Sequence, residues 1–137
     1  MSFDIFVIKF KDKKVVRFKR SIFEDIFGRY VIRRESRFMR IAYPDDGGAD
    51  IYVQDGEEIG SAMFNHCGGD MFFQDLYDFM ERAELALYWA DLAPCCAIPN
   101  KAMMADLSAD FLESVHTPSI VHNGKEITEA IGRSGEG

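Results

Sequence analysis

Residues 3–10 read FDIFVIKF, a stretch that alternates at the period of a β-strand. Apolar side chains fall on both of its faces: Phe3, Ile5 and Val7 on one, and Phe6, Ile8 and Phe10 on the other. A strand that is apolar on both faces is typical of the interior of a sheet. The sequence therefore predicts that residues 3–10 form a strand near the middle of a sheet.

Further β-type runs follow this strand, separated by turn residues. The Asp55-Gly56 pair favours a tight hairpin turn between two of them. The expected strands cover residues 15–18, 30–34, 38–43, 50–54, 59–64, 85–89 and 119–121. The whole pattern predicts an α+β fold: a mainly antiparallel sheet of about five or six strands, with two main helices packed on it and short helices near the C-terminus.

The two main helices are expected to begin at Ser21 and at Asp70. Ser21 followed by Glu24 matches the capping-box pattern, and Gly28 is expected to end that helix at the usual C′ position. Asp70 is expected to be the N-cap of the second helix, which extends to about Glu84. The short helices are expected over residues 100–105, 108–115 and 126–131.

The length of 137 residues and the apolar content of 47% predict one domain over residues 1–131, followed by a frayed tail over residues 132–137. The three cysteines show no disulfide framework. The opening Met1-Ser2-Phe3-Asp4 has an acid where a secretory signal has bases, and no run approaches the roughly 18 apolar residues of a membrane span. We therefore expect a cytoplasmic protein without a membrane partner.

Charge is unevenly distributed along the chain. Residues 1–40 carry twelve Lys or Arg against five Asp or Glu, a balance of +7. Residues 41–137 carry four bases against eighteen acids, a balance of −14, so the net charge is −7. The second segment has too few bases to neutralise its own acids, and a surplus of carboxylates must remain at the surface. This asymmetry indicates a charged partner without naming it.

The leading hypothesis is a non-enzymatic binding protein that presents an acidic surface to a basic protein partner, because complementary charge accelerates encounter and adds specificity. The acids of this surface come from an acidic loop region and from the second helix: Asp45, Asp46, Asp50, Asp55, Glu57, Glu58, Asp75, Asp78 and Glu81. On that helix, Arg82 is expected to pair with Asp78, four residues earlier. The sequence does not set the oligomeric state.

A first alternative is a metal-assisted hydrolase that acts on phosphorylated substrates. Asp45 or Asp46 together with Asp50 would supply the one or two carboxylates that Mg²⁺ needs, although solvated turns are the favoured interpretation of these acids. The potential zinc ligands form two adjacent pairs, His66-Cys67 and Cys95-Cys96. Paired zinc ligands are usually about two to four residues apart, so a zinc site is disfavoured and no cofactor is expected.

A second alternative is nucleic-acid contact through the basic N-terminal third, where aromatic residues stand among arginines. The arginines lie around one expected hairpin: Arg33, Arg34, Arg37 and Arg40. Against this alternative, the net charge of −7 would repel a polyanion. The favoured interpretation is that these arginines pair with the acids of the remaining chain across the sheet, so nucleic acid is not the expected partner.

Residues 1–7 (MSFDIFV), Phe27-Gly28, residues 47–53 (GGADIYV) and residues 87–89 (LYW) together resemble a group of small uncharacterised bacterial single-domain proteins. The resemblance covers most of the chain and carries no catalytic or binding residues. In size and acidity the chain is also similar to immunity proteins of bacterial toxin systems. That likeness implies an inhibitor that binds a basic enzyme through its acidic surface.

Overall fold

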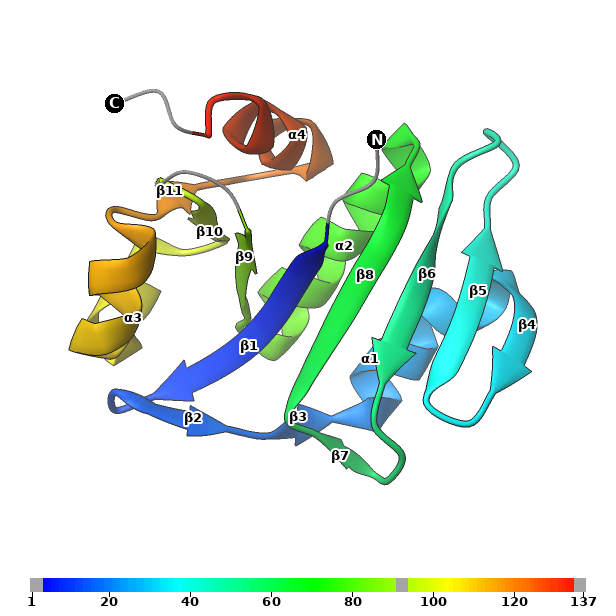
Figure 1. The fold of residues 1–137 in the computed structure, drawn as a ribbon, viewed down its shortest axis with the longest axis horizontal. Coiled ribbons are helices and arrows are strands. Elements are labelled where there is room, and N and C mark those ends of the chain that lie inside the picture. The colour runs from blue at the N-terminus through cyan, green and yellow to red at the C-terminus, as the bar shows by residue number, and fades with distance from the viewer. Residues whose placement is uncertain (1–3, 91–93, 135–137) are drawn as a thin grey trace.

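The computed structural model describes residues 4–90 and 94–134. Over these residues the fold is mixed α+β with a mostly antiparallel nine-stranded sheet, which confirms the expected fold class (Figure 1). The sheet has the order β11-β10-β9-β1-β8-β6-β5-β4, with β2 paired to β1, and a separate pair joins β3 to β7. Only the β10–β11 pairing in the described sheet is parallel. The strands beyond the expected five or six include the short β2, β10 and β11.

The strands are β1 (Ile5–Lys11), β2 (Lys14–Val16), β3 (Phe18–Lys19), β4 (Val31–Glu35), β5 (Phe38–Ala42), β6 (Gly48–Val53), β7 (Glu58–Ile59), β8 (Ser61–Gly68), β9 (Ala86–Trp89), β10 (Cys96–Ile98) and β11 (Ser119–Ile120). The α-helices are α1 (Arg20–Phe27), α2 (Asp70–Ala83), α3 (Ala109–Val115) and α4 (Gly124–Gly132). Two 3₁₀ helices, η1 (Gly28–Tyr30) and η2 (Lys101–Asp106), complete the described elements.

Strand β1 lies between β8 and β9, as its two apolar faces predict. Ile5 is opposite Phe64 of β8 and opposite Trp89 of β9. Both Ile5 and Val7 are buried on the face that packs against the helices. Residue 3 of the expected strand lies outside the described residues. The central position of β1 is therefore confirmed for residues 5–8, while residues 9–11 pair with β2.

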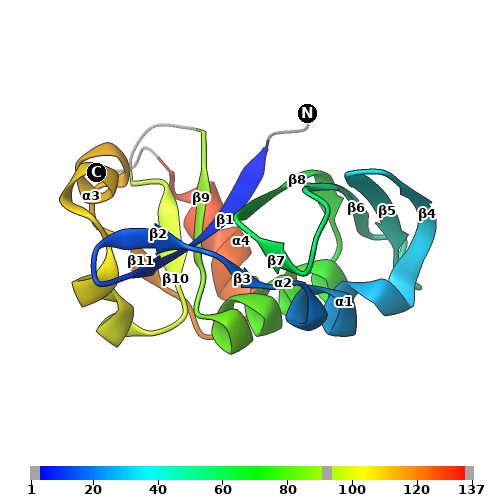
Figure 2. The same cartoon turned by 90° about the horizontal axis from the view of Figure 1, so that it is seen from below.

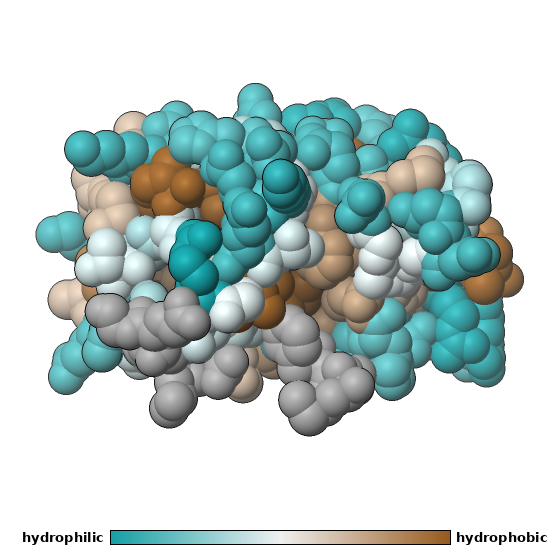
Figure 3. Space-filling model, turned by 90° about the horizontal axis from the view of Figure 1, so that it is seen from above, coloured by the Kyte–Doolittle hydropathy of each residue, from teal (hydrophilic) through white to brown (hydrophobic). Residues whose placement is uncertain are grey.

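The helices α1 and α2 cover one face of the sheet, behind the strands in Figure 1 and below them in Figure 2. No described helix covers the opposite face of β8, β6 and β5 in these views. We call this opposite face the open face. Seen from above, the molecule is polar over most of its surface, with apolar residues in separate patches (Figure 3).

The core between sheet and helices is built from phenylalanine rings. Phe27 of α1 lies 5.4 Å from Phe79 of α2 and 5.6 Å from Phe64 of β8, measured between ring centroids. Phe27, Phe64 and Phe79 are completely buried. The apolar residues of α2 recur at helical spacing and face the core, as predicted: Phe72, Leu76, Phe79, Met80 and Ala83. This contact fixes both helices on the sheet.

The predicted N-terminal capping of α1 is wrong, whereas the helix ends before Gly28 as predicted. Its N-cap is Lys19, which makes no side-chain capping bond, and Ser21 lies inside the helix. Glu24 accepts hydrogen bonds from Arg34 of β4 (2.9 and 3.1 Å), because a guanidinium offers two charge-assisted donors where the capping box offers one amide. Gly28 follows the helix where expected, but its φ of −60° is right-handed, so the chain continues into η1.

The chain end is ordered further than a tail starting at residue 132 implies. Gly132 is the last residue of α4. The indole Nε1 of Trp89 donates a hydrogen bond to the Ser134 hydroxyl at 3.1 Å. Residues 135–137 of the expected tail lie outside the described part of the chain. The boundary at residue 131 stays a prediction.

Candidate functional site

The acids of the predicted surface occupy three places in the fold. Asp45, Asp46 and Asp50 lie before or within the first half of β6. Asp55, Glu57 and Glu58 lie at or after its other end, where the chain turns into β7. The third group is on α2, on the far side of the sheet from the open face: Asp75, Asp78 and Glu81. Each group has different neighbours and therefore a different role.

Asp45 caps helix α2 from a distant loop. Its Oδ2 accepts the Met71 amide at 3.1 Å and its Oδ1 accepts the Gly47 amide at 2.9 Å. The Met71 and Gly47 amides hold the pKa of the Asp45 carboxyl below its ordinary value. The predicted N-cap Asp70 is instead the first helical residue, and Gly69 takes the N-cap position with φ of +94°. The Asp45 carboxylate stabilises the start of α2, since the first-turn amides of a helix need an acceptor.

Asp50 is buried and binds two neighbours on the open face. Its Oδ1 accepts Arg40 Nε at 2.7 Å, and its Oδ2 lies 2.9 Å from His66 Nδ1. The Arg40 hydrogen bond holds the pKa of Asp50 below its ordinary value. Asp50, Arg40 and His66 line a shallow hollow together with the exposed Asp46. An imidazole oriented by a buried carboxylate has the geometry of a general base.

Neither the Cys67 thiol nor the Cys96 thiol is suited to act as a nucleophile beside His66. Burial raises the pKa of the adjacent Cys67 thiol to about 12, so this thiol is protonated at neutral pH. Cys96 lies on β10, which is separated from β8 by β9 and β1, or about 14 Å at normal strand spacing. Over residues 4–90 and 94–134, no three His, Cys, Asp or Glu side chains are grouped to hold a metal ion.

The acids at the turn between β6 and β7 face bases from the N-terminal segment. Asp55, Glu57 and Glu58 line a surface hollow with bases on the opposite wall: Arg17, Lys19 and Arg20. Asp55 also lies 3.7 Å from Arg37 and accepts the Ser36 hydroxyl at 3.2 Å. Gly56 has φ of +112°, which agrees with the predicted Asp-Gly turn. Three bases therefore lie near these three acids, and Asp55 is the one with an ion pair among the described residues.

Asp75 is a structural residue of the helix–sheet contact. Its exposed fraction is 9%, and its Oδ2 accepts the hydroxyl of the buried Tyr43 at 2.8 Å. Arg29 approaches both carboxylate oxygens at 3.4 Å from the solvent side. Burial and the Asp75 carboxylate raise the pKa of Tyr43. Only one edge of Asp75 therefore faces solvent.

Asp78 and Glu81 lie in a groove between α1 and α2. We define the α1–α2 groove by its lining residues: Asp25, Ile26, Arg29, Asp75, Asp78, Glu81 and Arg82. Arg82 pairs with Asp25 at 3.4 Å, and not with Asp78 as predicted, because α1 brings that acid within reach. Asp78 accepts Gln74 Nε2 at 3.2 Å. No arginine or lysine is within ion-pair distance of Asp78 or Glu81 among the described residues.

Tyr77 of α2 lies close to these carboxylates. Burial raises the pKa of Tyr77, and Glu81 and Asp78 raise it further, with a smaller effect from Glu126 of α4. Sequence reasoning included Asp78 and Glu81 but missed Asp25 and Glu126, which come from other helices. The only sequence feature that could have indicated Asp25 and Glu126 is that each is an acid on the polar side of an amphipathic helix.

The arginines around the β4–β5 hairpin are paired within the molecule. Each of the five around the β4–β5 hairpin has a carboxylate partner: Arg29 with Asp75, Arg33 with Glu35, Arg34 with Glu24, Arg37 with Asp55 and Arg40 with Asp50. Three of these partners belong to the acidic remainder of the chain, as the favoured interpretation predicts. The others are close in sequence or on α1. This pairing removes most of the positive charge that a polyanion would need.

Comparison with known proteins gave no match. No family model matches the chain, and no curated protein or solved structure is similar to it. The resemblance to small bacterial proteins and to immunity proteins stays a prediction. Among the described residues, none of the helices combines the length and apolar character that crossing a membrane requires. The protein's function is therefore inferred from its own surface.

Proposed function

We propose that this protein is a non-enzymatic binding protein whose α1–α2 groove docks a basic protein partner, in the manner of an immunity-type inhibitor. The observation that carries the proposal is the charge of that groove. Four carboxylates line it against two guanidinium groups, and both guanidinium groups are already paired with carboxylates. Asp78 and Glu81 are left to receive basic side chains of a partner.

The groove is suited to this role because its walls are rigid. Asp75 is held by Tyr43, and the buried Phe27 and Phe79 fix α1 against α2. The backbone that carries Asp78 and Glu81 is therefore fixed, and only their own side chains are ordered when a lysine or arginine binds. Complementary charge of this kind raises the association rate most strongly at low salt.

The alternatives have less support from the site. A metal-assisted hydrolase would need the carboxylate of Asp45 or Asp46 together with that of Asp50. Asp45 and Asp50 already accept hydrogen bonds from the Met71 amide and from Arg40, and Asp46 alone would leave a single uncommitted carboxylate. A nucleic-acid surface would need arginines that are paired within the chain. A basic protein is therefore the partner that the groove favours.

The experiment is a pull-down from the native host with a matched pair of variants. Asp78→Asn with Glu81→Gln removes two charges from the groove, while Asp110→Asn with Glu113→Gln removes two exposed charges from α3. We expect the wild type and the α3 variant to retain a basic protein. The groove variant should retain about tenfold less of it. Equal retention by both variants would refute the proposal.

A further inference from the structure

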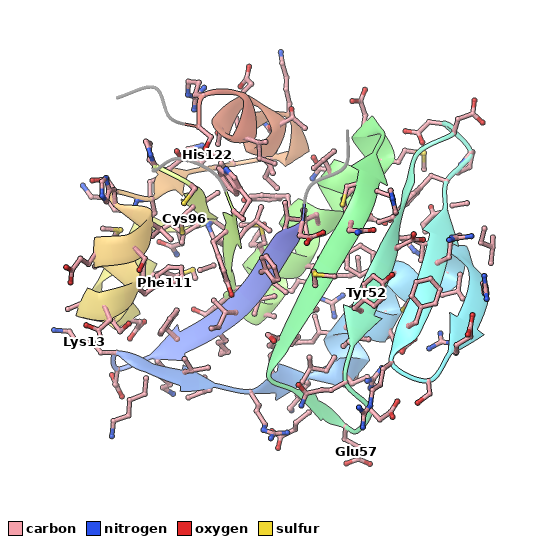
Figure 4. All side chains as sticks on the ribbon, in the orientation of Figure 1. Lys13, Tyr52, Glu57, Cys96, Phe111 and His122 are labelled. Carbon is pink, nitrogen blue, oxygen red and sulfur yellow. The ribbon has the colours of Figure 1, made fainter. Side chains whose placement is uncertain are left out.

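A strip of apolar side chains crosses the open face of the sheet at right angles to the strands. Its members are opposite one another on five successive strands: Tyr88 of β9, Phe6 of β1, Met63 of β8, Tyr52 of β6 and Phe38 of β5. We call these five residues the aromatic strip. Figure 4 shows Tyr52 on the open face, in front of β6 and away from α1.

The aromatic strip is continuous and open to solvent. The rings of Phe6 and Tyr88 stack at 5.2 Å, and those of Phe38 and Tyr52 lie 5.1 Å apart. Tyr52 is 42% exposed, and the other four residues are partly buried. Phe111 of α3 contacts Tyr88 at one end of the strip at 5.5 Å. Contiguous apolar surface of this kind marks an interaction site.

The charges at the Phe38 end of the aromatic strip are paired. Beside Phe38, Arg33 is paired with Glu35 and Arg40 with Asp50. Both guanidinium groups also lie 5.9 Å from the centre of the Phe38 ring. An apolar strip with a balanced border does not select a polyanion or a basic protein. It fits a flat, apolar and electrically neutral surface.

We propose that the aromatic strip is the interface of a homodimer, in which the open faces of two copies pack against each other. The strip itself is apolar, and the charges beside Phe38 are paired, so two copies can meet there without repulsion between unpaired like charges. The acidic α1–α2 groove is on the opposite side of the molecule and would repel its own copy. The dimer therefore leaves both grooves exposed, and this inference does not depend on what the grooves bind.

The size of the open face sets the strength of this dimer. From β9 to β4 it spans five strand spacings, or about 24 Å, and strands of five or six residues extend about 18 Å. The face therefore offers roughly 450 Å² per copy, or about 900 Å² in total, which is below the size of a standard stable interface. The expected dimer is weak, with a dissociation constant of roughly tens of micromolar or above.

Sedimentation velocity from about 1 to about 500 µM tests this proposal. We expect the wild type to change from monomer to dimer over this range. Salt at about 1 M should leave the dimer intact, since the contact is apolar. Tyr52→Lys should abolish the dimer, because Tyr52 is the most exposed member of the aromatic strip. Met71→Lys is the control, since Met71 has a similar exposed fraction of 36% but lies on α2.

The variants also keep the test independent of folding, because a surface residue can be replaced without opening the core. Thermal unfolding of Tyr52→Lys should remain close to that of the wild type. A wild type that stays monomeric at every concentration would overturn the proposal. So would a dimer that survives Tyr52→Lys, or one that is lost equally with Met71→Lys.

Discussion

Replacing Tyr43 with Phe is expected to lower the free energy of unfolding by about 2 kcal/mol. The change removes one hydroxyl, which donates to Asp75 at 2.8 Å in a site where both residues are nine-tenths or more buried. A hydrogen bond to a charged acceptor contributes about 1.5–3 kcal/mol to stability, and its loss leaves a carboxylate oxygen with only the longer Arg29 contact. The ring and its packing against Tyr30 are retained.

Urea unfolding followed by circular dichroism measures this loss, and the midpoint of thermal unfolding should fall by roughly 8 °C. A double-mutant cycle with Asp75→Asn should give a coupling energy of about 1–2 kcal/mol. Tyr52→Phe, which removes a hydroxyl from a residue that is 42% exposed, is the control and should change stability by less than about 0.5 kcal/mol. If Tyr43→Phe is as stable as the wild type, or the two changes are additive, Asp75 is not the structural residue described above.

Two further predictions concern the carboxylates that bind within the fold. Glu24 and Asp50 both have lowered pKa values, chiefly because of Arg34 and Arg40, so their contribution to stability is complete above the ordinary carboxyl pKa of about 4 and is lost as the pH falls through their lower folded values. Chemical denaturation between about pH 6 and pH 2 should show this decline, and a flat profile would contradict it. Asp45→Ala should speed amide exchange in the first turn of α2 while exchange in its last turn is unchanged; equal exchange in both proteins would show that Asp45 does not cap the helix.

Local patterns predicted the parts of the fold whose cause is local. The central place of β1 follows from its own two apolar faces, and the inner face of α2 follows from its own periodicity. The role of Asp75 could not be found in this way, because its partner Tyr43 is 32 residues away. Within α2, Asp75 looks like any acid beside Asp78, and only the tertiary structure separates a buried acceptor from a surface charge.

The capping of α2 and the aromatic strip were missed for a related reason. Asp45 precedes its amide partner Met71 by 26 residues, so no pattern at the helix start reveals it. The aromatic strip needs the register of four strand pairings at once, and a shift of one residue in any of them would turn a side chain to the other face. Alternation along single strands shows which residues share a face but not which residues become neighbours across it.

Hydrogen exchange of this protein, with and without the basic protein captured from its host, tests the role of the α1–α2 groove most directly. The account predicts slower amide exchange on binding in α1 and in the second half of α2, the elements that carry Asp25, Asp78 and Glu81. Exchange in β5 and β6 should be unchanged by the partner. Protection confined to the open face, with none in α1 or α2, would contradict the proposed function.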